Sequence, residues 1–469
     1  WDVSNVNNMF AMFAFAASFN QDIGGWNTAK VTRMDSMFSN ATSFNQDISS
    51  WSTGAATRMN SMFANALAFD QDLSTWDISS VSFMESMFQN AGLSTPNYDA
   101  TLSGWATLDA GETQVPSNIT FDGGNSTFCE SEADRQALID TFGWTITDGG
   151  KDCPIDFTNA FVTTWETTAS NESITIPTGS GLSYDYAVDW GDGTIDTNIN
   201  GPATHTYASV GIQTVSIVGI LPRLNFRFSA DRNKIRTIQQ WGDIAWSSME
   251  EAFRGCSNLE LVATDAPDLS NVTTLKSMFN GCSSMVGNSS FDTWDTSTIT
   301  NMEAVFLNAS SFNAPIGSWN LSGVTIISSL FLNASAFNQP IGNWDTSSIT
   351  QMFGVFNNAS AFNQPLANWN TANVTIFDNM FNGAVSFNQP LNNWDVSSAS
   401  VNNFMFANTT AFDQPLGDWD ISSFTRMNGF FSGAGLSTAN YDATLTGWAT
   451  LDAGETQIPT ITTSFDGGN

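Results

Sequence analysis

The sequence predicts a repeat protein, in which two solenoid arrays of short parallel strands and helical turns are separated by an all-β module. Three observations lead to this fold class. Tryptophan returns every 25 residues in two long stretches, a nearly identical passage occurs twice, and the region between the stretches lacks the repeated motif. A fixed period of this length is typical of stacked supersecondary units, because each unit is too small to bury its apolar face alone.

The tryptophans mark the units of both arrays, and positions within a unit are numbered from its tryptophan. They are Trp1, Trp26, Trp51 and Trp76 in the first array and Trp294, Trp319, Trp344, Trp369, Trp394 and Trp419 in the second. Val or Ile returns at +5, an apolar residue at +8, Phe at +12, Ala at +15, Phe at +18 and Ile or Leu at +22. We expect these side chains to line the core.

Two periodicities follow each other within a unit. Apolar and polar residues alternate around each tryptophan, as over 76–78, which favours a short strand with the tryptophan inward. From +5 to +15, as over 31–41, apolar residues are three and four apart, which favours a short helix or helical turns. Strand, turn, helix and return loop within 25 residues is the leucine-rich-repeat plan, with a parallel sheet on one side of the stack.

A second, larger repeat interrupts the first. The passage GLSTPNYDATLSGWATLDAGETQVP, which begins at Gly92, returns from Gly435 with few changes, a shift of 343 residues. The first copy continues into a segment where Ser131 to Thr141 predicts an amphipathic helix, whereas the second copy stops before that segment. A terminal unit that breaks the repeat and supplies polar surface is what a stack needs at its end. We therefore expect two capping segments and a chain that is part of a longer protein.

These features divide the chain into five parts. We expect a first array over 1–91, a capping segment over 92–153 and an all-β module over 154–225. A second array is expected over 226–434, followed by a truncated capping segment over 435–469.

The four cysteines form two local pairs. Cys129 and Cys153 bracket the first capping segment, and a bridge there would stabilise it by roughly 3 kcal/mol. Cys256 and Cys282 occupy equivalent places one unit apart, at a spacing that a disulfide accepts if strands stack. Both pairs are expected to bridge in an oxidising compartment, with two stacked free thiols as the alternative for the second pair.

The region between the arrays consists of short strand-like runs separated by turn residues, which predicts an all-β sandwich. It contains V-D-W-G-D-G-T at 188–194 and H-T-Y at 205–207. These motifs resemble the W-G-D-G-T and H-x-Y signatures of PKD-like domains. The resemblance implies an immunoglobulin-like module of an extracellular protein.

The unit sequence M-F-x-N-A-x-x-F-N-Q-P-I/L-x-x-W-D-x-S-x-V-T recurs in about ten units. It resembles the BspA-like leucine-rich-repeat surface proteins of bacteria, and the giant adhesins of gliding bacteria are a related alternative. The resemblance implies a secreted or cell-surface location and attachment to host proteins, other cells or surface polysaccharides. Neighbouring copies of the large repeat are expected in the full-length chain.

The composition disfavours two classes of partner. Thirteen basic residues against 45 acidic ones give a formal net charge of −32, which opposes binding to nucleic acid and to anionic membranes. No segment of the sequence predicts insertion into a membrane. Only 12% of residues are charged while 41% are hydrophobic, so we expect a folded chain with a mostly uncharged polar surface.

The sequence gives little support to catalysis. The single histidine, His205, lies in the strand motif of the module, where a structural role is expected. With this histidine in a structural role, no other histidine and no unpaired reactive cysteine evident, nucleophilic triads and histidine-rich metal sites find little support. Forty-five acidic residues make some carboxylate pair inevitable, so glycosidase chemistry has no specific signal. We expect no enzyme.

The residue after each tryptophan is the candidate ligand-binding position. In the second array these residues are Asp295, Asn320, Asp345, Asn370, Asp395 and Asp420. Stacked in register, they would form a polar row that could bind glycan directly or through Ca²⁺. The alternative, which we favour, is that they bond turn amides. A second row, Asn or Asp at +19, is expected to satisfy the backbone of the return loop.

A calcium site is a second candidate. Asp189, Asp192 and Asp196 cluster near one turn of the module, and carboxylates suit Ca²⁺. The W-G-D-G-T turn is itself a sufficient reason for the first two. No other cofactor is expected.

Together these features predict a segment of a long secreted or cell-surface adhesin. The arrays would offer a rigid face for multivalent weak contacts with extracellular glycan or protein surfaces, and the module would be a spacer. The alternative is a passive stalk or filament that holds a distal tip domain away from the cell.

Overall fold

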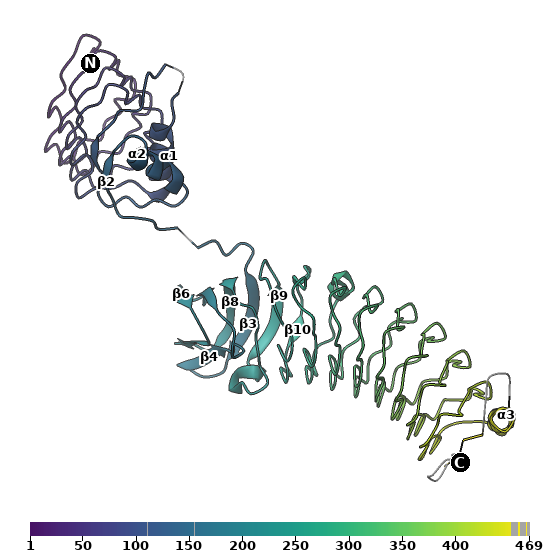
Figure 1. The fold of residues 1–469 in the computed structure, drawn as a ribbon. Coiled ribbons are helices and arrows are strands. Elements are labelled where there is room, and N and C mark those ends of the chain that lie inside the picture. Colours follow the sequence, from purple (N-terminus) through teal and green to yellow (C-terminus); the bar gives the residue numbers. More distant parts are fainter. Residues whose placement is uncertain (110, 154, 452–457, 460–465, 467–469) are drawn as a thin grey trace. The chain divides into compact units, whose positions relative to one another are not determined.

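The computed structural model describes residues 1–109, 111–153, 155–451, 458–459 and 466 (Figure 1). The chain divides into two compact units, Trp1–Ile155 and Asp156–Asn469. We describe each by itself.

The first compact unit contains a run of repeats followed by a small α/β segment. Over 1–94 the chain forms only turns and isolated parallel bridges, which join Asn8, Arg33, Arg58 and Phe83 one unit apart. The segment after it contains α1 (Thr95–Ala106), β1 (Thr120–Asp122), α2 (Glu132–Asp140) and β2 (Thr145–Thr147). β1 and β2 pair in parallel, and α2 lies where the sequence predicts a helix.

The second compact unit begins with a β-rich module. Its strands are β3 (Phe161–Thr167), β4 (Glu172–Ile176), β5 (Asp185–Asp189), β6 (Ile195–Ile199), β7 (Ala203–Tyr207), β8 (Gly211–Ile220), β9 (Ile235–Gln240) and β10 (Glu260–Leu261). Six of them form one mixed sheet in the order β10-β9-β3-β8-β5-β6, and β4 pairs with β7. Two short 3-10 helices, Ala230–Asn233 and Ser289–Thr293, and α3 (Thr438–Trp448) complete the elements.

The predicted leucine-rich-repeat solenoid, with strands at the tryptophans and helical turns after them, is wrong. The three α-helices of the described residues all lie in the repeated capping passages or the segment after the first one, and the main sheet is mixed. Over 1–94 and 294–437 no helix or strand forms, and the parallel bridges lie at +7 rather than at the tryptophan. The sheet of the β module continues past the predicted boundary at residue 225, because β9 and β10 extend it toward the repeats that follow (Figure 1).

The apolar spacing from +5 to +15 does not distinguish a helix from a chain of turns, because both conformations place residues three and four apart on one face. Residues at +10 and +14 have positive φ, as at Ser36 (54°) and Asn40 (60°), which an α-helix cannot accommodate. Alternate N–H groups donate to the following unit instead of to the preceding turn, as Phe38 N does to the Met62 carbonyl at 2.9 Å. The overlooked signal is Asn or Gly at +14, the residue types that tolerate the left-handed region.

Seven of the repeat tryptophans link their unit to the preceding one through the indole N–H. The indole N–H of Trp369 donates to the Ile341 carbonyl at 3.0 Å, and the same carbonyl accepts the Trp344 backbone N–H at 3.2 Å. Both lone pairs of that oxygen are thereby used. The equivalent indole bond is made by Trp51, Trp76, Trp319, Trp344, Trp394 and Trp419.

Aromatic rings fill the interior in layers. Within a unit the two phenylalanines stack closely, as Phe356 and Phe362 do with centroids 4.0 Å apart. Between units Phe331 and Phe356 are 5.8 Å apart, and Trp369 and Trp394 are 6.3 Å apart. These rings are buried. The core positions predicted from the period are therefore correct for most units, although Trp1 is 87% exposed and Trp26 is only partly buried. The backbone that carries them is not the predicted one.

The two capping passages end their repeats in the same way. The Trp105 indole of α1 donates to the Leu73 carbonyl at 3.0 Å, and the Trp448 indole of α3 donates to the Leu416 carbonyl at 2.8 Å. Within an array the following unit supplies this indole N–H donor. Each capping helix therefore takes the place of a following unit in this hydrogen bond. Stacks of repeats need such ends to satisfy their last polar groups.

The indole bond can be isolated by comparing two Trp→Phe variants. Among the described residues, the buried Trp294 indole has no hydrogen-bond partner, whereas the Trp369 indole has one. Both variants remove the same ring volume, so Trp369→Phe should lower the free energy of unfolding by about 1–3 kcal/mol more than Trp294→Phe. Urea unfolding followed by circular dichroism measures the difference, and equal losses would show that the bond contributes nothing.

Candidate functional site

The three aspartates of the predicted calcium site serve separate structural roles. Asp189 Oδ1 accepts the Gly191 N–H at 2.8 Å, and Asp196 Oδ2 accepts the Trp190 indole N–H at 2.8 Å. Asp192 contacts His205 Nε2 at 2.8 Å. Among the described residues, no group of three or more His, Cys, Asp or Glu side chains is arranged to hold a metal ion. The structure therefore does not bring this predicted site together.

The W-G-D-G-T and H-x-Y motifs interlock. The His205 ring stacks on Trp190 with centroids 5.0 Å apart, and Tyr207 donates its hydroxyl to the Trp190 carbonyl at 2.9 Å. The hydrogen bond from His205 lowers the pKa of Asp192. Gly191 has φ +77°, and a Cβ there would collide with the Thr214 carbonyl oxygen. These contacts give Trp190, Gly191, Asp192, His205 and Tyr207 structural roles.

The row after the tryptophans is exposed, but each member is bound into a turn. Asp345 Oδ1 accepts the Ser347 N–H at 3.0 Å, and hydrogen bonds from the Ser347 hydroxyl and backbone lower the pKa of Asp345. The same i to i+2 bond occurs at Asp295, Asn320, Asn370, Asp395 and Asp420. Asp420 is partly buried and the others are exposed. Bonding of turn amides is the role that the sequence favours for this row. The Asp and Asn side chains remain at the surface.

The second polar row links units directly. Asn363 Oδ1 accepts the Asn388 N–H at 3.0 Å and the Gln389 side-chain amide at 2.9 Å. The row ends in the aspartates Asp70 and Asp413, each of which accepts a side-chain amide from a capping helix, α1 or α3. Asn97 donates to Asp70 Oδ1 at 2.8 Å, and Asn440 donates to Asp413 Oδ1 at 2.8 Å. The predicted structural role of this row is confirmed.

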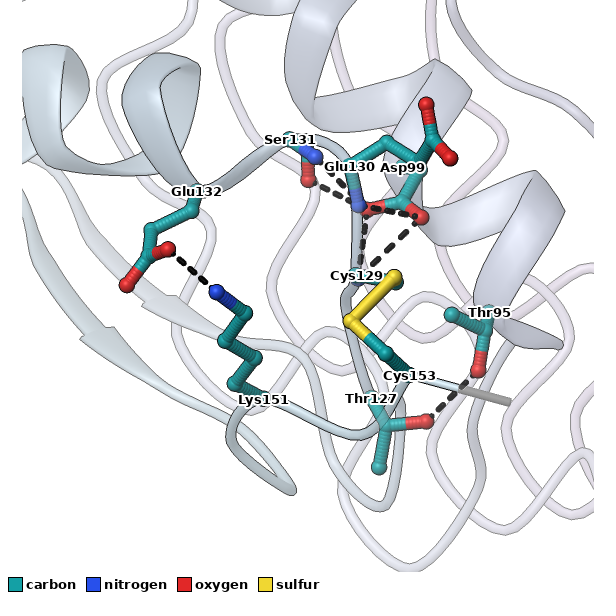
Figure 2. The surroundings of a disulfide bond; sticks show 9 residues. All are labelled: Thr95, Asp99, Thr127, Cys129, Glu130, Ser131, Glu132, Lys151 and Cys153. Carbon is teal, nitrogen blue, oxygen red and sulfur yellow. Dashed lines mark hydrogen bonds and ion pairs between the residues drawn. A yellow bond between two sulfur atoms is a disulfide. The ribbon is translucent and has the colours of Figure 1, made fainter. Parts of the chain in front are cut away.

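The cysteines divide into one bridge and two thiols. Cys129 and Cys153 form a disulfide (Figure 2). Cys256 and Cys282 are free and buried, so their predicted bridge is wrong. Their side chains point into the core from successive units, and the Cys282 thiol donates to the Phe253 carbonyl at 3.2 Å.

A carboxylate beside the disulfide anchors the start of α2, and the sequence analysis missed it. Figure 2 shows Asp99 of α1 facing the backbone of residues 129–131. It accepts the N–H groups of Cys129 at 3.0 Å, Glu130 at 3.1 Å and Ser131 at 3.0 Å, and the Ser131 hydroxyl at 2.6 Å. Burial alone would raise the pKa of Asp99, but these hydrogen bonds hold it below its ordinary value. The signal in the sequence was its place in the repeated passage, where Asp442 is its counterpart.

The comparisons with known proteins place the repeated units in a family. A family model described as "Mycoplasma protein of unknown function, DUF285" matches residues 1–105, 247–351 and 337–448, more than half of the chain. The chain belongs to the DUF285 family. The matched segments contain the repeats and the capping helices α1 and α3 of this DUF285 protein, while the module between β3 and β8 lies outside them.

No curated protein and no solved structure matches the chain. In the part of this DUF285 protein that the structure describes, no helix has both the length and the apolar character that crossing a membrane requires.

The state of the buried thiols can be read by alkylation. Burial raises the pKa of both Cys256 and Cys282, so neither thiol should react with iodoacetamide in the native protein at neutral pH. Unfolding in urea without a reductant should expose two reactive thiols in each chain, and peptide mass spectrometry should place them at these positions. Recovery of a Cys256–Cys282 peptide pair would contradict the structure, and the intact Cys129–Cys153 pair is the internal control.

The Asp99 anchor predicts a dependence of stability on pH. Because the folded pKa of Asp99 lies below its unfolded value near 4, its contribution is complete above about pH 4 and is lost as the pH falls through the folded pKa. Asp99→Asn should lower the free energy of unfolding by about 1–3 kcal/mol at pH 7 and reduce its slope between pH 5 and 2.5, which urea titrations measure.

The matched control for this prediction is Asp442→Asn in α3. Asp442 holds the same place in its helix but is exposed. This variant should keep the wild-type slope, and an equal effect of both variants would refute the role of Asp99.

Proposed function

We propose that this chain is an adhesive segment of a secreted or cell-surface protein, which binds extracellular glycan or protein surfaces through many weak contacts. The observation that carries the proposal is the regular presentation of exposed polar side chains. Successive units offer the same chemical groups in rows, and a row of identical sites raises avidity without requiring strong individual contacts.

The rows are held in place by the packing of the units. The Asp or Asn after each tryptophan is fixed by its turn hydrogen bond, as at Asp295 and Asp345. Threonines at +6 form another exposed row, in which the Thr350 hydroxyl donates to the Thr325 carbonyl at 3.4 Å. Fixed side chains lose little conformational entropy when they bind, which favours weak multivalent recognition.

Charge and cysteine chemistry support the proposed partners and location. A net charge of −32 opposes contact with nucleic acid and with anionic lipid, and leaves glycans and proteins as partners. The Cys129–Cys153 disulfide supports export to an oxidising compartment. The resemblance to BspA-like surface proteins and PKD-like modules supports the same location, with neighbouring copies of the large repeat in the full-length chain. The proposal assigns no catalytic activity.

A passive stalk is the second candidate. The two copies of the capping passage favour it, because α1 and α3 end their repeats with the same hydrogen bonds. Duplication of a self-contained block is a simple way to gain length. A stalk needs no ligand along its surface, so binding by the isolated chain separates the two candidates.

Adhesion can be measured with beads that carry the intact chain. We expect retention on surfaces coated with polysaccharide or host-matrix protein, with retention rising steeply with the density of chain on the bead, because the contacts are multivalent. Chelation of Ca²⁺ with EGTA should leave retention unchanged, since the aspartates of the module are committed to separate partners. Beads with heat-unfolded chain are the control. No retention on any surface would leave the stalk as the function.

A further inference from the structure

The basic residues of this acidic chain are concentrated in one place. Seven of its 13 Lys and Arg residues lie within 223–276. Three of them, Arg227, Arg232 and Arg254, line a surface hollow of about 520 Å³ where the module meets the first units of the second array. The acidic composition of the whole chain therefore does not explain why these basic residues gather in one place.

The arginines at the hollow exceed their carboxylate partners. Arg227 and Arg254 share a single buried carboxylate, Glu251, at 3.2 Å and 2.7 Å. Arg232 is exposed and donates to the Arg227 carbonyl at 3.3 Å. Among the described residues Arg232 forms no ion pair, while the neighbouring Asp231 pairs with Lys234. The hollow consequently carries an excess of positive charge in a protein of opposite sign.

The hollow exists because two successive units lack a side chain. At the positions equivalent to +14, where most units carry Asn, these units carry Gly255 and Gly281, both with φ near +80°. A Cβ on Gly255 would meet the Arg232 Cδ at 3.0 Å, so the Arg232 side chain lies beside the first glycine. A Cβ on Gly281 would meet the Gly255 backbone, with the Cα nearest at 3.4 Å, so no side chain fills the space beside the second. At Gly383, by contrast, the side chain of Asn358 occupies the equivalent space.

An exposed aromatic ring borders the hollow. Phe228 is 86% exposed, and the Arg227 guanidinium carbon lies 4.7 Å from its ring centroid. The polar groups of Asn233, Ser257 and Asn280 line the same space. A flat apolar ring, uncharged hydrogen-bonding groups and guanidinium forks together suit a sugar ring that bears an acidic group.

We propose that this hollow binds an acidic sugar residue of a polysaccharide, with its carboxylate or sulfate paired to Arg232. This inference rests on the proposed adhesive function and specifies a ligand class for it. A single anionic group fits the small basic surface, whereas a nucleic acid, with one charge per about 1.7 Å, needs an extended basic tract. The sugar ring packs against Phe228, and its hydroxyls bond to the amides and hydroxyl of the lining.

Calorimetric titration of the intact chain at low salt tests the proposal. The probes are a hyaluronan tetrasaccharide, which carries carboxylates, and a keratan sulfate oligosaccharide, which carries sulfates. The methyl ester of the first and the desulfated form of the second are the neutral controls. Binding to one acidic probe and not to its neutral form supports the proposal and identifies the acidic group.

Variants locate the site. Arg232→Gln should weaken binding at least about tenfold, since a charged hydrogen bond is lost. Gly281→Asn should abolish binding by filling the hollow, and it should fold, because Asn308 occupies the same left-handed position in a later unit. Arg426→Gln removes one exposed charge elsewhere in the same array and should bind like the wild type.

Several outcomes would overturn the inference. Equal affinity for an acidic probe and its neutral form would do so, as would wild-type affinity of a folded Gly281→Asn variant. Binding of a DNA duplex with the same dependence on Arg232, in the absence of sugar binding, would reassign the site. If wild-type beads adhere and Arg232→Gln beads adhere equally to acidic polysaccharide, this inference fails while the adhesive function stands. Loss of all wild-type adhesion removes the function itself.

Discussion

Hydrogen bonds between successive units are the constraint on which the rest of the structure depends. Alternate backbone N–H groups, at +8, +10, +12 and +14, donate forward to the next unit, as Phe38 does to Met62. The indole N–H donates backward, as Trp369 does to Ile341. No unit can satisfy its own buried polar groups, so each requires its neighbours. An aliphatic side chain at the tryptophan position could fill the core but could not supply this donor.

The same constraint explains what happens where the period fails. At the capping passages, α1 and α3 supply the indole and amide donors that another unit would bring. Near the start of the second array the spacing is irregular, and the Trp294 indole is left without a partner in the described part of the chain. The two glycines that open the basic hollow, Gly255 and Gly281, lie in this irregular region. The basic hollow therefore forms where the units depart from the regular 25-residue spacing.

Much of the interior could be predicted from the sequence, and much of the backbone could not. The period identified the buried Phe and Trp positions and the rows of Asp and Asn, because residues one period apart occupy equivalent places. It did not identify the conformation, because apolar spacings of three and four suit both a helix and a chain of turns with left-handed residues. The basic hollow was missed because the period does not show which side chains from neighbouring units surround Gly255 and Gly281.

By itself the sequence determined which residues are equivalent, which face the core and where the repeat is interrupted, since these follow from hydrophobic periodicity. Only the tertiary structure decided which equivalent residues meet. Cys129 and Cys153 bridge because the chain returns on itself beside Asp99, whereas Cys256 and Cys282 are buried in successive units as free thiols. Asp189, Asp192 and Asp196 are close in sequence, yet each is bound to a different partner. The direction of a side chain is set by the backbone around it, and it cannot be predicted from spacing along the chain.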